Sequence, residues 1–214
     1  MAPGAVIFDF NGTLSDDEPI LYQIFAELFA EHGKPLSRRD YYDHLAGHSD
    51  PEIVRLWLGR DHPDLDSVVA ERVDRYRTAV RDGSTITQGV RESVRYAAER
   101  VPVAIVSGAA RAEIEPVVTA AGLAPLFRAI VSADDVVEGK PHPEGYLQAL
   151  ELLGDGIRAD RVLVFEDTEA GVASAKAAGM SCVALTRTLG AARLSQADEL
   201  IPELEPAVLR RLLA

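Results

Sequence analysis

Residues 5–19 read AVIFDFNGTLSDDEP, and this stretch decides the fold. Its first four residues, Ala5 to Phe8, are apolar, which is typical of a strand buried on both faces of a parallel sheet. The apolar run stops at Asp9, and Gly12 follows close behind. A carboxylate therefore lies where a buried strand opens into a loop, the place where open α/β sheets bind ligands. Taken alone, the same residues also fit a simple turn capped by Asp9.

Length and composition limit the classes of protein. The 214 residues are enough for one large domain, or a main domain with a smaller insert, and 47% of them are hydrophobic. The net charge of −12 argues against a nucleic-acid partner, because phosphate backbones need a basic face. Cys182 is the only cysteine, which excludes an internal disulfide. Neither a transmembrane pattern nor a signal-peptide pattern is present, so we expect a soluble cytoplasmic protein with no membrane partner.

Helical periodicity fills the part of the chain that follows the first strand. The predicted helices cover residues 19–33, 37–45, 50–58 and 65–81. The charged stretch 72–81 has alternating signs, which favours a solvated helix face. His32, His44 and His62 show no partner spacing, and we interpret them as surface residues.

From Thr87 onward, short apolar strands alternate with helices. The predicted strands cover residues 101–106, 127–131, 162–165 and 181–185. This alternation is typical of right-handed βαβ units. The sequence therefore predicts an α/β fold, a doubly wound, Rossmann-like parallel sheet built from residues 1–15 and 85–214. A helical cap domain at 16–84 is inserted into it, and residues 189–205 show no clear pattern.

Polar residues follow the ends of several predicted strands. They are Asp9, Ser107, Gly108, Lys140, Glu166 and Asp167. Because the carboxyl ends of parallel strands meet at one edge of the sheet, we expect these residues to share one crevice. The three carboxylates form an oxygen donor set suited to Mg²⁺. Lys140 and the Ser107 hydroxyl supply the donors that a phosphoryl group needs, and an aspartate can accept such a group covalently.

The sequence resembles the haloacid dehalogenase superfamily. The similarity is to its capped phosphatase branch, which includes β-phosphoglucomutases and phosphoglycolate phosphatases. Four motifs carry the resemblance: DFNGTL at 9–14, VSG at 106–108, GKPHPE at 139–144 and VFEDTEAGV at 164–172. Their order and spacing agree with the family over nearly the whole chain. The resemblance implies a Mg²⁺-dependent phosphatase of a small phosphorylated metabolite that works through an aspartyl-phosphate, as a monomer or homodimer.

The resemblance also assigns roles to residues. It implies that Asp9 is the nucleophile and a Mg²⁺ ligand, and that the backbone carbonyl of Asn11 is a second ligand. Asp167 is implied as a third ligand, assisted by Glu166. Ser107, Gly108 and Lys140 are implied as the phosphate-binding residues, and Lys140 also as part of the catalytic machinery.

Asn11 departs from the family, whose phosphatases carry an aspartate there to protonate the leaving oxygen and activate water. Loss of a general acid/base typically lowers the rate about 10²- to 10⁴-fold. Four explanations stay open: an engineered trap of the phosphoenzyme, a substrate with a good leaving group, a proton supplied by Asp16, Asp17 or His48, or a metabolite-binding protein that has lost catalysis. We expect a natural variant with retained but altered phosphatase activity.

In this family the cap chooses the substrate. His48 follows Gly47 in a loop that could face Asp9, and we predict that it contributes to substrate specificity, although a surface histidine is the plainer interpretation. Asp50 and Leu21 lie where phosphosugar mutases of the family use a basic residue and a histidine. Both differences weaken the mutase alternative.

Overall fold

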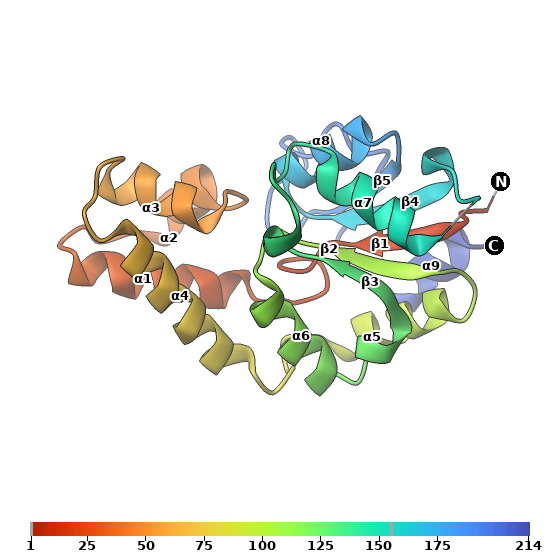
Figure 1. Ribbon diagram of the computed structural model, residues 1–214, viewed down its shortest axis with the longest axis horizontal. Helices are drawn as coiled ribbons and strands as arrows, with labels where there is room; N and C mark the ends of the chain where they lie inside the picture. The colour runs from red at the N-terminus through yellow and green to blue at the C-terminus, as the bar shows by residue number, and fades with distance from the viewer. Residues whose placement is uncertain (1, 155) are drawn as a thin grey trace.

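The computed structural model describes residues 2–154 and 156–214, and its core is a parallel sheet (Figure 1). The strands are β1 (Ala5–Phe8), β2 (Val103–Val106), β3 (Phe127–Val131), β4 (Val162–Glu166), β5 (Ser181–Leu185) and β6 (Glu199–Ile201). Their order is β3-β2-β1-β4-β5-β6, so the chain starts at the centre and winds outward in both directions. The direction of winding switches between β1 and β4, where such sheets bind ligands. The predicted fold class is confirmed.

Strand β1 is buried on both faces because all four of its residues are apolar. Val6 lies opposite Val103 of β2 on one side and Leu163 of β4 on the other. Phe8, the last residue of β1, stacks on Phe165 with ring centroids 5.4 Å apart. This apolar packing fixes the end of β1 beside the end of β4 and so determines where Asp9 emerges.

Helices cover both faces of the sheet (Figure 1). One face carries α7 (Glu144–Leu153) and α8 (Glu169–Ala177), and the other carries α5 (Gln88–Ala98), α6 (Arg111–Ala120) and α9 (Pro206–Leu212). Short 3₁₀ turns lie at Ala124–Leu126, Ala133–Asp135 and Ala159–Arg161. No helix in the described ranges combines the length and the apolar content that crossing a bilayer requires.

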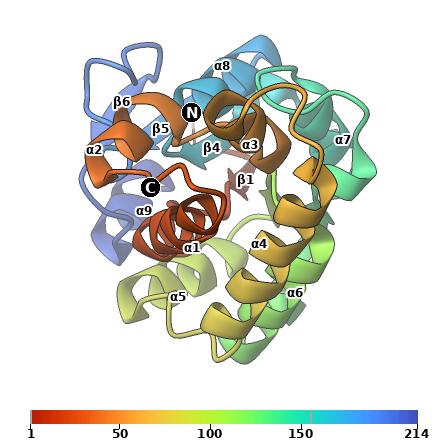
Figure 2. The same cartoon turned by 90° about the vertical axis from the view of Figure 1, so that its left-hand side faces the viewer.

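A group of helices lies to one side of the sheet, beyond the carboxyl ends of its strands (Figures 1 and 2). It consists of α1 (Glu18–Glu31), α2 (Arg38–Asp40), the π-helical turn Tyr41–Leu45, α3 (Asp50–Leu58) and α4 (Leu65–Val80). Phe25, Phe29 and Tyr41 are buried between these helices, and Trp57 stacks on Phe29. Helix α4 also runs beside α6 and so links this group to the rest of the molecule (Figure 2). The division into core and cap domains at residues 16 and 84 stays a prediction.

Three local predictions need correction. Strand β2 begins at Val103, two residues later than predicted, after Pro102, which has no N–H for the ladder. Strand β6 lies in the stretch that showed no pattern, because three residues at a sheet edge are too few to give a periodic signal. Helix α4 is not solvated throughout 72–81: Arg72, Tyr76 and Val80 recur every four residues and are buried along one side.

Candidate active site

Lys140 joins the ends of three strands. Its Nζ lies 2.5 Å from Asp9 Oδ1, just beyond β1, and 2.5 Å from Glu166 Oε1, at the end of β4. It also donates to the carbonyl of Val106, the last residue of β2, at 3.1 Å. The structure thus brings together residues that are far apart in the sequence, as their positions after parallel strands predicted.

Asp9, Glu166 and Asp167 form a compact carboxylate cluster. Each offers an oxygen within 4.8 Å of the other two, and all three residues are buried. Thr13 donates to Asp167 Oδ1 at 3.2 Å, whereas Asp167 Oδ2 has no hydrogen-bond partner among the described residues. A side chain at Gly12, whose φ is +71°, would overlap that oxygen. An orphaned carboxylate oxygen in an acidic cluster fits a bound divalent cation.

Burial and mutual repulsion set the pKa values of this cluster. Burial raises the pKa of Asp9 to about 7, against the lowering effect of Lys140. The pKa of Asp167 is raised well above its usual range by burial and then by the charges of Asp9 and Glu166. Burial opposes the charge on Lys140, but Asp9 and Glu166 outweigh it and raise the pKa of the ammonium group. Lys140 is therefore a permanent cation.

Glu166 is held in place by the start of α8. Its Oε2 accepts the N–H groups of Asp167 and Thr168 at 2.9 and 3.1 Å, and the Thr168 hydroxyl at 3.0 Å. Burial opposes ionisation of Glu166, yet Lys140 and these N–H groups lower its pKa. A side chain at Gly171 would overlap this carboxylate. Glu166 therefore orients Lys140 in the manner of a fixed counter-ion.

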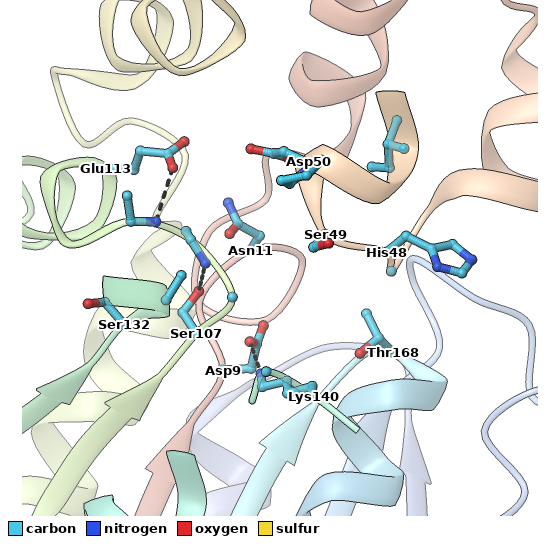
Figure 3. Close-up of a pocket in the computed structure, with 18 of the residues that line it drawn as sticks. Asp9, Asn11, His48, Ser49, Asp50, Ser107, Glu113, Ser132, Lys140 and Thr168 are labelled. Atoms are coloured by element: carbon cyan, nitrogen blue, oxygen red, sulfur yellow. Dashed lines mark hydrogen bonds and ion pairs between the residues drawn. The ribbon is translucent and has the colours of Figure 1, made fainter. Parts of the chain in front are cut away.

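Ser107 and Gly108 follow β2 and line the same cavity as Asp9. The N–H of Ala109 donates to Ser107 Oγ at 3.0 Å, which fixes the direction of the hydroxyl (Figure 3). Because Oγ is the acceptor in that bond, the hydroxyl proton is available to a phosphate oxygen.

Asn11 is held by two side chains of the helical group. Its Nδ2 donates to Asp17 Oδ2 at 2.9 Å and to the Tyr76 hydroxyl at 3.0 Å. Tyr76 also donates to Asp17 Oδ2, and the N–H of Gly12 donates to Asp17 Oδ1 at 3.1 Å. Asp17 is fully buried, and burial raises its pKa. The loop after β1 is thereby fastened to helix α4.

A cavity of about 560 Å³ lies between the strand ends and the helical group. Asp9, Ser107 and Lys140 lie at its sheet end (Figure 3). Asp50 of α3 and Glu113 of α6 lie at the opposite end, which we call the cap end, with Asn11 between the two ends (Figure 3).

The three residues that were predicted as alternative proton sources, His48, Asp16 and Asp17, differ in where their side chains lie relative to the cavity. The imidazole of His48 is turned away from Asp9 and lies 3.3 Å from Glu52, although His48 lines the cavity (Figure 3). Asp16 is exposed and pairs with Arg187 at 3.5 Å, and Asp17 reaches the cavity only through Asn11. Glu18, which the sequence did not single out, lines the cavity directly. Burial, followed by the charge of Asp17, raises the pKa of Glu18 to about 7.

Sequence reasoning missed the buried cation of the cap end. Arg72 of α4 is 3% exposed and forms an ion pair with Glu113 and another, at 3.1 Å, with Asp50. Its spacing of four residues from Val68 and Tyr76, both buried, was the available signal. Of the histidines interpreted as surface residues, His32 is exposed and His62 is half-buried, and their ring centroids lie 5.0 Å apart.

Comparison with known proteins decides the family. The model of the haloacid dehalogenase-like hydrolases matches residues 6–185. The chain belongs to this family. It is 32% identical to the validoxylamine A 7′-phosphate phosphatase of Streptomyces hygroscopicus subsp. limoneus, over 92% of each chain. It is 29% identical to a phosphoglycolate phosphatase of Pseudomonas putida, over 86% of this chain and 70% of that protein.

Solved structures agree with the fold. The crystal structure of CbbY from Rhodobacter sphaeroides in complex with phosphate has a TM-score of 0.82 at 23% identity, over 94% of this chain and 95% of that one. The family and the enzyme class predicted from the sequence, a haloacid dehalogenase-like phosphoric monoester hydrolase, are therefore confirmed. The role of each site residue stays a prediction.

Proposed function

We propose that the protein is a Mg²⁺-dependent phosphatase of a small phosphorylated metabolite that works through an aspartyl-phosphate on Asp9. The observation that carries the proposal is Lys140, which bridges Asp9 and Glu166 beside a carboxylate oxygen that lacks a partner. The relatives named for phosphatase activity on small phosphate esters support it.

The chain's own residues account for phosphate capture. Lys140 keeps its proton, so it can offset negative charge on the phosphoryl oxygens as a bond forms between phosphorus and an Asp9 oxygen. The Ser107 hydroxyl and the N–H of Gly108 can donate to the same oxygens. Asp9, Asp167 and the carbonyl of Asn11 would hold Mg²⁺, which supplies further positive charge for the developing transition state.

Asn11 compromises the two proton transfers of the reaction, one as the ester oxygen leaves and one as water releases the phosphate. The ester oxygen that leaves must take up a proton, and the water that attacks the aspartyl-phosphate must lose one. An amide can do neither, and the Nδ2 of Asn11 is occupied by Asp17 and Tyr76. We therefore propose an intact phosphoryl-transfer site with slow turnover.

The test is phosphate release from p-nitrophenyl phosphate and acetyl phosphate, with Mg²⁺ and with EDTA. We expect release that requires Mg²⁺ and is lost in Asp9→Asn while the circular dichroism spectrum is retained. Asp160→Asn, an exposed carboxylate far from the cavity, is the matched control and should keep its activity. Normal release by Asp9→Asn would overturn the mechanism. Binding of Mg²⁺ and phosphate without turnover of either compound would instead identify a metabolite-binding protein.

A further inference from the structure

The two ends of the cavity differ in charge. The sheet end carries Lys140 and the donors for one phosphoryl group. At the cap end the described lining residues include two carboxylates, Asp50 and Glu113, and one cation, Arg72, which is paired with both of them (Figure 3 shows Asp50 and Glu113). The part of a substrate that lies beyond its phosphate therefore meets an acidic wall.

The cation of this wall is already paired with carboxylates of the protein. Arg72 is buried and forms ion pairs with Asp50 and Glu113, so two carboxylates share one guanidinium group. A second phosphate or a carboxylate on the substrate would have to draw Arg72 away from these acids. The buried Glu113 carboxylate, whose side chain is 2% exposed, would then lose its counter-ion, which is strongly unfavourable.

The wall suits hydroxyl groups for a second reason. Carboxylate oxygens only accept hydrogen bonds, and the side chain of Asp50 is 21% exposed, so it can accept from a ligand. A substrate hydroxyl group can donate such a hydrogen bond, whereas a second phosphate or carboxylate that carries no proton cannot.

We propose that the cap end selects a polyhydroxylated phosphate monoester and rejects any ester that carries a second acidic group. The inference rests on the proposed function, because it places the phosphate of the ester beside Lys140. Asp50 and Arg72 are then specificity residues that face the carbon skeleton of the substrate. Lys140 and Ser107 bind the phosphate of every ester alike.

The experiment compares ligands of similar size in Asp9→Asn, which binds but should not turn over. Isothermal titration with saturating Mg²⁺ gives the dissociation constants of glucose 6-phosphate, 6-phosphogluconate and fructose 1,6-bisphosphate. We expect glucose 6-phosphate to bind about tenfold or more tightly than the other two, since like charges placed close together oppose binding. Equal or tighter binding of 6-phosphogluconate, or no binding of glucose 6-phosphate, overturns the inference.

A second variant separates charge selection from shape. Asp50→Asn, added to Asp9→Asn, leaves Arg72 with one carboxylate, and the preference for glucose 6-phosphate over 6-phosphogluconate should shrink severalfold. Asp74→Asn, an exposed carboxylate of α4 that does not line the cavity, should leave the preference unchanged. An unchanged preference in the Asp50 variant would overturn the role of the acidic wall.

The two proposals fail in different ways. If the unmodified protein releases phosphate with Mg²⁺ but 6-phosphogluconate binds as well as glucose 6-phosphate, only the charge selection is wrong. If glucose 6-phosphate is preferred but no ester is hydrolysed, the phosphatase proposal is wrong and the ligand class stands.

Discussion

The side-chain amide of Asn11 donates a hydrogen bond of 2.9 Å to the buried carboxylate of Asp17. The bond joins the residue at the family's acid/base position to the start of helix α1. Tyr76 of α4 donates to the same carboxylate. Position 11 is thus surrounded by groups that would favour a protonated acid there, although the chain supplies an amide.

The first prediction concerns an acid at position 11. In Asn11→Asp, two carboxyls would lie within hydrogen-bond distance, and like charges that close retain a proton. The new side chain would hold the proton that a general acid needs. We expect the Mg²⁺-dependent turnover of glycerol 2-phosphate to rise about 10²- to 10⁴-fold. The gain should be smaller for p-nitrophenyl phosphate, whose leaving group departs without a proton.

Asp16→Asn is the control for that experiment, because the Asp16 side chain is exposed and pairs with Arg187. Its turnover should match that of the unmodified protein. Equal rates for the unmodified protein and Asn11→Asp would mean that another group already moves the proton, and Glu18 would be the next residue to substitute.

The second prediction concerns the ion pair between helices α4 and α6. Arg72→Leu leaves the buried Glu113 carboxylate without its counter-ion, and we expect the free energy of unfolding to fall by about 3–5 kcal/mol. Arg75→Leu removes only exposed pairs from the same helix, and we expect a loss of about 1 kcal/mol or less. Urea denaturation measures the free energy of unfolding of both variants. Adding Glu113→Leu to Arg72→Leu should recover much of the loss, and equal effects of the two arginine variants would contradict this account.

The third prediction is a pH dependence of stability. Burial raises the pKa of Glu18 to about 7 from an ordinary value of 4.5, so folding favours the protonated acid. The stability that Glu18 contributes is complete below pH 4.5 and is lost as the pH rises through 7. Glutamine does not titrate and can still accept the Tyr41 hydroxyl.

Melting temperatures with EDTA test this prediction. The melting temperature of Glu18→Gln, relative to that of the unmodified protein, should increase between pH 5 and pH 8. Glu27→Gln, an exposed glutamate of the same helix, should show no such trend. A constant difference between Glu18→Gln and the unmodified protein across this range would rule out the raised pKa.

The fourth prediction concerns the carboxylate cluster. Burial, and then repulsion from Asp9 and Glu166, raise the pKa of Asp167, so folding favours its protonated form and Asp167 lowers the stability of the metal-free protein as the pH rises. We expect Asp167→Asn to melt at a higher temperature with EDTA. The same variant loses a Mg²⁺ ligand, so its melting temperature should respond less to added Mg²⁺. Asp160→Asn should respond like the unmodified protein, and an undiminished response in Asp167→Asn would exclude it as a ligand.

The sequence determined the fold class and the residues at the strand ends. The apolar run at Ala5–Phe8 is typical of a strand buried on both faces, and the later strand and helix alternation permits few topologies. Since the carboxyl ends of such strands share one edge, Asp9, Ser107, Lys140 and Glu166 had to meet. The motifs around them are local in sequence, and for that reason the family could be recognised.

Tertiary structure decided the surroundings of the site. The pairing of Asn11 with Tyr76 spans 65 residues and that of Arg72 with Glu113 spans 41, and no local pattern encodes which side chains meet when α4 packs beside α6. The acidic wall of the cavity follows from the same packing, because Arg72 of α4 meets Asp50 of α3 and Glu113 of α6 there. Strand periodicity places a residue at an edge, but the charge, burial and partners of a side chain depend on segments that approach only in the folded chain.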